Sequence, residues 1–395
     1  MTLVYYGIYQ LFLLGMNITH KRIFIIVTEA KFFFSHRYAL IKKLSQDHIK
    51  FHVITYFEDK VPPDESNIKY TFLNSDRKAF SLVNFFQNSY KLHCLIKEFS
   101  PDIVYAISHR SIFLASIANL FLKKKLLFAI SGIGSIFSDG LPDKKFSQAN
   151  LLKILVIKVY QLVIKEKNSF FIFQNTEDLN VFRDYKITDS KKNFIIPGNG
   201  LEKSFFHIAD ENQQVTKFIM IARILRDKGV IEFLQAAQKV LSIYPDITFS
   251  LYGSFDFTNP KVIKFEELKK YLGPSIKYEG HAQNIRSEII NSSAVVLPSY
   301  REGFSRVLME AQACSKPVIT SDVPGCRDVI IENITGYLVK PQNVTDLVGK
   351  IIMLVENNDE YNKMSRNAFK HAENSFSLDR AVQKHHEIFN KLTSI

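Results

Sequence analysis

The sequence predicts an α/β protein made of two doubly wound domains that face each other across a cleft. The chain has 395 residues, more than one ordinary hydrophobic core accommodates. Short apolar runs alternate with helical patterns, and this alternation starts afresh after a turn-rich segment at Ile196–Gly200. We therefore expect a first domain at 1–200, a second at 201–378, and a C-terminal helix at 379–395 that packs back on the first domain.

The first domain is expected to begin with a buried parallel strand at Arg22–Val27, because a continuous apolar run is typical of a strand covered on both faces. Helices are predicted at 38–45, 112–121 and 149–165. Further strands are predicted at Lys50–Tyr56, Ile103–Ile107, Lys125–Ile130, Ser169–Gln174 and Asn193–Ile196.

Residues 1–15 form a mostly apolar segment that lacks a basic region and a small-residue cleavage site, and it is too short to span a bilayer. Met16 opens a short polar leader into the first strand. We interpret 1–15 as a mis-annotated leader, and a membrane-associated extension is the alternative. The rest of the sequence holds no apolar run of membrane-spanning length.

The second domain repeats the alternation of strands and helices. Helices are predicted at 230–241 and 304–314. Strands are predicted at Lys217–Ala222, Thr248–Tyr252, Ile276–Glu279, Ala294–Leu297, Pro317–Thr320 and Gly336–Val339.

The net charge of +12 lies almost entirely in the first half of the chain. Residues 1–205 hold 28 Lys and Arg against 17 Asp and Glu, and the remainder holds 23 against 22. A basic half suits an anionic membrane surface or a phosphate-bearing substrate, and a solvated lysine-rich surface is the alternative. Nucleic acid is not expected as a partner, because the aromatic residues lie in apolar runs rather than among basic ones. Three scattered cysteines fit packing residues in a reducing compartment.

Two cations bracket the turn after the predicted strand at 217–222. Arg223 and Lys228 are five residues apart, and Gly229 stands at the entrance of the following helix. Cations beside a helix N-terminus can hold a pyrophosphate together with the backbone N–H groups. Two solvated loop cations are the alternative.

A second candidate segment runs from Leu297 to Glu310, where a strand ends and a helix starts. Gly303 permits close approach of the backbone to a ligand. Glu302 and Glu310 are eight residues apart, about 12 Å along a helix. This separation exceeds that of the paired carboxylates in glycoside hydrolysis, roughly 5–9.5 Å, so the two glutamates are better placed to hold two ends of one elongated ligand.

A set of short motifs in residues 193–345 resembles family 4 glycosyltransferases in order and spacing. The motifs are Arg223 with Lys228-Gly229, Tyr252-Gly253-Ser254, Glu279-Gly280-His281, Pro298 to Ser305 with Glu310, Pro324 to Asp328, and Thr335-Gly336-Tyr337. The resemblance implies the GT-B fold and retaining transfer from an activated sugar nucleotide. One departure is Asp328, which stands where the family usually has Glu and keeps the charge.

The resemblance also implies roles for individual residues. Arg223 and Lys228 would hold the donor diphosphate, and Glu302 would contact the donor sugar. Glu310 would bind the ribose hydroxyls. The remaining donor-site residues would be Gly253 and the backbone of Gly303, Phe304 and Ser305, the latter three binding phosphate.

The first half resembles a narrower group, bacterial enzymes that extend undecaprenyl-diphosphate-linked sugars, often from UDP-N-acetylhexosamines. The motifs are Phe33 to Arg37, Gly132 to Phe137, and Phe173-Gln174-Asn175. We expect Ser35, His36 and Arg37 at a strand end, where they can bind an acceptor diphosphate, with an ordinary helix start as the alternative. The loop containing Gly132 and Gly134 would let a ligand approach the backbone.

His109 follows the strand at 103–107 near the expected cleft and is a further catalytic candidate, although a lone histidine there is more often structural. The sequence holds no Asp-x-Asp pair, so we expect a metal-independent site in which Arg223 and Lys228 neutralise the leaving group. No cofactor is expected besides the UDP-sugar donor substrate. Gly132 and Gly134 lack the third glycine of a dinucleotide fingerprint, which argues against NAD.

Together these observations predict a retaining transferase. It would move a hexose or N-acetylhexosamine from a UDP-sugar to a polyprenyl-diphosphate-linked saccharide, at the inner face of the cytoplasmic membrane. Two alternatives use the same donor site. One is a sugar-nucleotide epimerase of GT-B fold, and the other is a catalytically idle sugar-nucleotide binding subunit.

Overall fold

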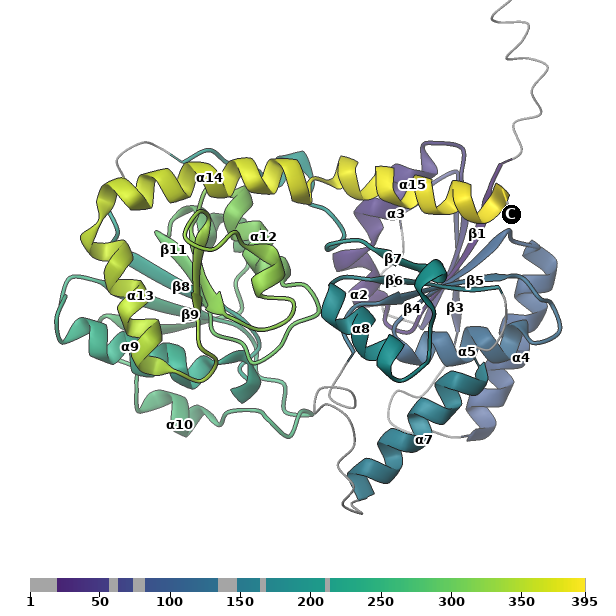
Figure 1. Cartoon of the computed structure of the whole chain (residues 1–395), viewed down its shortest axis with the longest axis horizontal. Helices are drawn as coiled ribbons and strands as arrows, with labels where there is room; N and C mark the ends of the chain where they lie inside the picture. Colours follow the sequence, from purple (N-terminus) through teal and green to yellow (C-terminus); the bar gives the residue numbers. More distant parts are fainter. Residues whose placement is uncertain are drawn as a thin grey trace, which may run out of the picture. The chain divides into compact units, whose positions relative to one another are not determined.

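The computed structural model of the protein describes residues 20–56, 63–73, 82–133, 148–163, 168–209 and 214–394. The expected leader at 1–15 and the candidate residue Gly134 lie outside the described residues. Two sheets form the framework, and the strand pairs recorded in both are parallel. The predicted α/β fold of two doubly wound sheets is confirmed (Figure 1).

The first sheet has the strand order β3-β2-β1-β4-β5-β6-β7. Its strands are β1 (Arg22–Val27), β2 (Lys50–Tyr56), β3 (Ile68–Leu73), β4 (Ile103–Ile107), β5 (Lys125–Ile130), β6 (Ser169–Phe173) and β7 (Asn193–Ile195). Its helices are α2 (Ala30–His36), α3 (Tyr38–Ser45), α4 (Leu82–Phe99), α5 (His109–Asn119), α7 (Gln148–Val163) and α8 (Thr176–Asp184). All five residues of β4 are buried, as expected of a central parallel strand.

The second sheet has the order β10-β9-β8-β11-β12-β13. Its strands are β8 (Lys217–Ile221), β9 (Thr248–Tyr252), β10 (Ile276–Gly280), β11 (Ala294–Leu297), β12 (Val318–Ser321) and β13 (Gly336–Val339). Its helices are α9 (Val230–Leu241), α10 (Phe265–Lys269), α11 (Ile285–Ile290), α12 (Arg306–Ala313), α13 (Val344–Glu356) and α14 (Asn358–Phe376), followed by α15 (Leu378–Ser394). Helix α9 packs beside α13, and α12 packs beside α14 (Figure 1).

Hydrophobic spacing explains why these helices bury one face. In α9 the buried residues include Val230, Phe233, Leu234 and Ala237, which recur at three- and four-residue intervals. This is the spacing of an amphipathic helix that lies on a core. The core beneath α9 includes the β-strand residues Phe218 and Phe249.

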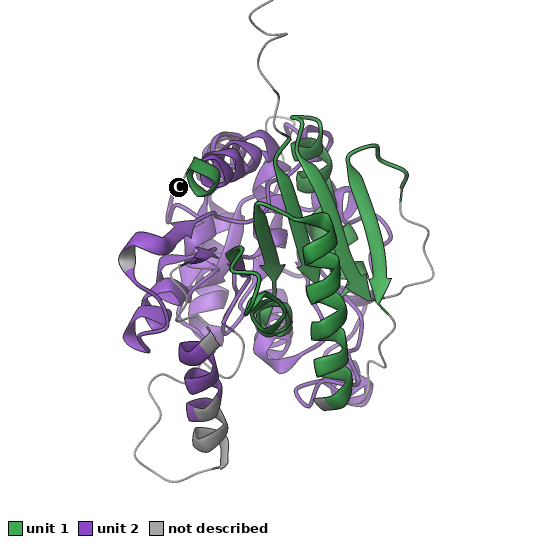
Figure 2. Cartoon of the chain, turned by 90° about the vertical axis from the view of Figure 1, so that its right-hand side faces the viewer, with its two compact units in different colours: residues 1–127, 391–395 green, residues 128–390 purple. Residues whose placement is uncertain are grey.

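The chain divides into two compact units (Figure 2). Unit 1 comprises residues 1–127 and 391–395, and unit 2 comprises residues 128–390, so the boundary falls inside β5. Within unit 1, the Lys125 ammonium donates to the carbonyl of Leu392 at 2.5 Å. The expected domain boundaries at residues 200 and 378 stay a prediction.

Strand order changes direction at one point in each sheet. In the second sheet β8 lies between β9 and β11, and in the first sheet β1 lies between β2 and β4. Ligands of open parallel sheets bind outside the carboxyl ends of the strands at such a switch point. The loops that follow β8 and β11 are therefore the ones to examine first.

One local expectation was wrong. Ser35 and His36 do not stand at a strand end, because β1 stops at Val27 and α2 covers Ala30–His36. Ala30 and Phe33 are buried one helical turn apart, so an amphipathic helix follows the strand directly. The Ser35 hydroxyl donates to the carbonyl of Lys31 at 2.6 Å, a bond typical of a serine inside a helix.

Candidate functional site at the switch point of the second sheet

Gly229 fixes the position of the first site loop. After β8 the chain makes a 3₁₀ turn at Arg226–Lys228, and Gly229 adopts a left-handed conformation with φ 75° before α9 begins. A Cβ atom at this position would stand 2.1 Å from the carbonyl oxygen of Pro298, the residue that follows β11. Glycine is therefore required for the two loops to meet, and the meeting brings Lys228 against the segment after β11.

Lys228 and Glu302 form an ion pair at this junction. The Lys228 ammonium lies 2.6 Å from Glu302 Oε1, and the two side chains are only 18% and 16% exposed. The hydroxyl of Ser299, a fully buried residue, donates to the same carboxylate oxygen at 2.9 Å. Two donors thus hold the Glu302 carboxylate in one orientation. The structure brings these two sequence-predicted residues together.

Arg223 lies on the same loop but has a different partner. Its guanidinium donates to Asp256 Oδ2 at 3.0 Å, and its side chain is 57% exposed. The side-chain hydrogen bond from Thr258 and the nearby Arg223 hold the pKa of Asp256 below its usual range. In this structure each predicted cation therefore holds a carboxylate of its own.

The loop after Glu302 is packed against two other backbones. A Cβ at Gly303 would stand 2.0 Å from the carbonyl oxygen of Ser131, and a Cβ at Gly132 would stand 3.3 Å from Gly303 Cα. The N–H groups of Glu302 and Ser305 donate to the carbonyls of Pro324 and Gly325, at 3.1 and 2.9 Å. We name residues 302–305 the donor loop.

Two residues of the donor loop are less available to a ligand than expected. The N–H of Ser305 is already used by the carbonyl of Gly325. The ring of Phe304 belongs to the core and lies edge-on to Phe376 at 5.8 Å between centroids. Among the described residues, the N–H groups of Gly303 and Phe304 have no backbone hydrogen bond, so these two can face a phosphate.

Glu310 lies on α12 and is almost completely buried. Arg306, one turn earlier, places its Nε 2.7 Å from Glu310 Oε1. Burial raises the pKa of the Glu310 carboxyl, and Arg306 opposes this shift. Asp328 has a structural contact, since its carboxylate accepts the N–H of Gly325 at 2.8 Å.

The segment after β6 also reaches the donor loop, which the sequence did not predict. Asn175 donates from its amide to the carbonyl of Gly303 at 2.7 Å. Arg301 lies 2.6 Å from Asp178, whose side chain is completely buried. Burial raises the pKa of Asp178, and Arg301 opposes the shift. The sequence offered two signals, the N-cap pattern of Asn175 followed by Asp178 and the Phe173-Gln174-Asn175 motif, and neither identifies the donor loop as the partner.

The acceptor and catalytic candidates of unit 1 lie on α2, at Arg37 between α2 and α3, and at the start of α5. Arg37 is 3% exposed and donates to the hydroxyl of Tyr105 at 3.3 Å. His36 lies 2.6 Å from the Ser35 hydroxyl. His109 is the first residue of α5 and follows Ser108, which has φ 84°. Their predicted roles in acceptor binding and catalysis stay predictions.

Gly253 follows β9 and is close to the first site loop. A Cβ there would stand 1.7 Å from the carbonyl oxygen of Ala222, so the strand ends of β8 and β9 can approach only at a glycine. In the part of the chain that the structure describes, no group of three His, Cys, Asp or Glu side chains is arranged to hold a metal ion. None of the described helices is long and apolar enough to cross a membrane.

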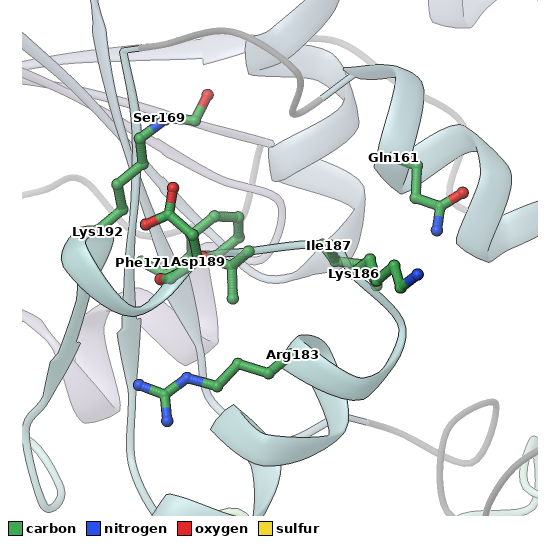
Figure 3. A pocket seen from close by; sticks show the side chains of 9 residues that line it. Gln161, Ser169, Phe171, Arg183, Lys186, Ile187, Asp189 and Lys192 are labelled. Carbon is green, nitrogen blue, oxygen red and sulfur yellow. The ribbon is translucent and has the colours of Figure 1, made fainter.

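A cavity of about 390 Å³ opens at the other end of β6 from Asn175 (Figure 3). Ser169, Arg183, Asp189 and Lys186 are among its lining residues. Figure 3 shows the side chains of Arg183 and Lys186 pointing in opposite directions, so their charges do not converge. None of the sequence-predicted site residues lines this cavity.

Two family models match the chain. The model described as "Glycosyl transferases group 1" matches residues 202–371, and the model described as "Glycosyl transferase 4-like" matches residues 22–167. Together they cover most of the sequence.

Two curated relatives carry names that state their reactions. The N,N'-diacetylbacillosaminyl-diphospho-undecaprenol alpha-1,3-N-acetylgalactosaminyltransferase of Campylobacter jejuni is 28% identical over 77% of this chain and 80% of its own length. The UDP-Gal:alpha-D-GlcNAc-diphosphoundecaprenol alpha-1,3-galactosyltransferase of Escherichia coli is 21% identical over 82% of this chain and 84% of its own length.

Solved structures share the fold at low identity. A glycosyltransferase from Rickettsia africae aligns with a TM-score of 0.73 at 19% identity, covering 95% of this chain and 99% of its own. The HepE protein of Anabaena, solved in complex with UDP, aligns with a TM-score of 0.71 at 16% identity, covering 94% of this chain and 100% of its own.

Proposed function

Because the chain belongs to the glycosyltransferases of the group 1 and 4-like families and has the GT-B fold, we propose that it is a retaining transferase that uses a UDP-sugar. The acceptor is proposed to be a saccharide linked to undecaprenyl diphosphate. The names of the Campylobacter and Escherichia coli relatives support this acceptor, and both state the transfer of a hexose or N-acetylhexosamine. The enzyme would meet this acceptor at the inner face of the cytoplasmic membrane.

The observation that carries the proposal is the Lys228–Glu302 pair at the switch point of the second sheet. The two side chains come from the ends of neighbouring strands and are mostly shielded from water. A preorganised ammonium in such a place stabilises negative charge that develops on a leaving diphosphate. Glu302, held by Lys228 and Ser299, can accept hydrogen bonds from the hydroxyls of the attached sugar.

Arg223 and Glu310 complete the proposed donor site. Arg223 is on the loop of Lys228 and would exchange Asp256 for the diphosphate when the donor binds. Glu310 would receive the ribose hydroxyls, since a buried carboxylate hydrogen-bonds a diol well. The protein would supply all of these charges from its own side chains, without a metal ion or cofactor.

The test is donor-dependent transfer by single-site variants. Lys228→Ala and Glu302→Ala are each expected to lower kcat at least about 100-fold, the scale for losing one preorganised charge contact. Arg226→Ala is the matched control, because Arg226 stands two residues before Lys228 but pairs with Glu267 in an exposed ion pair. Its activity should stay within about threefold of wild type.

The assay follows release of UDP and formation of a glycosylated undecaprenyl-diphosphate saccharide from a panel of UDP-sugars. Each UDP-sugar is also incubated with the enzyme alone, because an epimerase would change the sugar without an acceptor. Near-wild-type transfer by either alanine variant, or no transfer from any UDP-sugar to a lipid-linked acceptor, would refute the proposal.

A further inference from the structure

The side chain of Asn175, in the segment between β6 and α8, contacts the donor loop. Asn175 is 2% exposed, and its amide carries two hydrogen bonds. Its Nδ2 donates to the carbonyl of Gly303 at 2.7 Å, and its Oδ1 accepts the N–H of Asp178 at 2.7 Å. The second bond is the N-cap of α8, so the helix start and the donor loop are joined by a single carboxamide.

Close contacts with two neighbouring backbone segments restrict the position of the donor loop. Gly303 has no room for a Cβ against Ser131, and Gly325 has none against Glu302, where a Cβ would stand 2.3 Å from the carbonyl oxygen. The Gly303 carbonyl oxygen also lies beside Gly325, where a Cβ would stand 2.7 Å from it. These contacts limit which rotations of the Gly303 peptide are possible, and the hydrogen bond from Asn175 selects one of them, because it fixes where the Gly303 carbonyl points.

The rotation of that peptide bears directly on the proposed reaction. The Gly303 carbonyl and the Phe304 N–H belong to one planar peptide group, so fixing the carbonyl also fixes the direction of the N–H. The N–H of Ser305 is occupied by Gly325, which makes the Phe304 N–H one of the few donors that the loop can present to a phosphate.

We infer that Asn175 is a positioning residue for donor binding: its amide holds the Gly303–Phe304 peptide so that the Phe304 N–H faces the donor diphosphate. The inference rests on the proposed function, since it concerns the same donor site. Asn175 does not touch the reacting atoms and acts only through the donor loop.

The side chain of Asn175 offers a substitution that separates its two bonds. Asn175→Asp keeps the oxygen that caps α8, because Asp and Asn are equally good N-caps, and removes the N–H that Gly303 receives. A carboxylate oxygen would then oppose the Gly303 carbonyl. Asn175→Ser also keeps a capping oxygen, adds no charge, and is too short to reach Gly303.

Asn343 provides the matched control. It caps α13 by accepting the N–H of Asp346 at 2.9 Å, so Asn343→Asp and Asn343→Ser make the same changes at an N-cap remote from the donor loop. A loss of helix capping alone should affect the two pairs of variants alike.

The experiment measures UDP affinity by calorimetry, the melting temperature with and without UDP, and donor kcat/KM, all on the full chain. Both Asn175 variants should weaken UDP binding about 3- to 10-fold and lower kcat/KM by a similar factor, the scale for the net loss of one hydrogen bond. Both Asn175 variants should melt cooperatively above the assay temperature without UDP, so that their affinities are measured on folded protein, and the Asn343 variants should keep the UDP affinity of wild type.

The outcomes distinguish the two proposals. Wild-type UDP affinity and kcat/KM in both Asn175 variants would overturn the role of Asn175 and leave the donor site standing. Loss of cooperative melting in the Asn175 variants, or an equal loss of UDP affinity in the Asn343 variants, would show a structural role and also overturn it. If wild-type enzyme itself does not bind UDP, the proposed function fails and this inference fails with it.

Discussion

The buried ion pair of Arg301 and Asp178 allows a quantitative prediction. The Asp178 side chain is completely buried, one oxygen lies 2.6 Å from Arg301, and the other has no hydrogen-bond partner among the described residues. Replacing Arg301 by Met keeps much of its volume but leaves the carboxylate without a counter-charge. The expected loss of unfolding free energy at pH 7 is roughly 3–5 kcal/mol, the usual cost of breaking a buried pair from one side.

A double-mutant cycle separates charge from packing. Asp178→Asn removes the charge and retains an oxygen that can accept from Arg301, so this variant should lose about 1 kcal/mol or less. The double variant Asp178→Asn with Arg301→Met should recover part of the stability that Arg301→Met loses, because no buried charge is left unpaired.

The pH dependence gives an independent check with a fixed sign. Burial raises the pKa of Asp178 in the folded protein above its value in the unfolded chain. Protonation therefore favours the folded state, and the stability linked to this group is full below the ordinary pKa and is lost as pH rises through the raised value. Without Arg301 the pKa should rise further, so Arg301→Met should regain stability relative to wild type between pH 7 and pH 5.

Circular dichroism melting at pH 7 and pH 5 tests all three statements. At pH 7 the melting temperature of Arg301→Met should fall by roughly 6–20 °C. If Arg301→Met has the melting temperature of wild type at pH 7, the reasoning is refuted. It is also refuted if the double variant is no more stable than Arg301→Met.

Two further predictions concern a site residue and a buried histidine. Asp256→Asn should strengthen UDP binding up to about fivefold by releasing Arg223 from an exposed ion pair, and calorimetry showing weaker binding would contradict this. His52 is 2% exposed, and its Nε2 lies 2.8 Å from the Thr71 hydroxyl. Burial is the main cause that lowers the pKa of His52 to about 4, and the positive charge of Lys69 lowers it further. Because the unfolded chain binds this proton more readily, stability should fall as pH drops from about 6.5 toward 4. Denaturant titrations of His52→Gln should show a shallower fall, and equal slopes would exclude this role for His52.

The sequence was sufficient for most central strands, because parallel strands buried on both faces are continuous apolar runs. Residues 22–27, 50–56, 103–107 and 125–130 are strands with the predicted bounds. The edge strand β3 was missed, since its interior residues are exposed or half-buried and its apolar run is interrupted by Lys69 and Thr71.

The sequence predicted which residues meet at the site only where the strand order alone brings them together. Lys228 and Glu302 are 74 residues apart, yet each follows a strand at the switch point, and they lie together as expected of one site. The direct ion pair between them was not predicted. The partner of Arg223 was not predictable, because Asp256 reaches it from a loop whose path no periodicity encodes. The bond from Asn175 to Gly303 spans 128 residues. The sequence indicated a helix cap at Asn175 and a motif of the first half of the chain, and neither identifies Gly303 as the partner.

Backbone contacts at glycines explain why much of the site geometry could not be predicted from the sequence. A Cβ would stand 2.1 Å from the Pro298 carbonyl at Gly229, 2.0 Å from Ser131 at Gly303, and 2.3 Å from Glu302 at Gly325. Each glycine costs conformational entropy on folding, about 0.5–1 kcal/mol relative to alanine in regular structure. Glycine occurs at these positions because two backbone segments are in contact there. Those contacts determine where the charged side chains on the neighbouring residues lie. The sequence indicates a turn or a close backbone approach at these glycines, but it does not identify the carbonyl that each one faces, because that partner is set by the fold and not by the neighbouring residues.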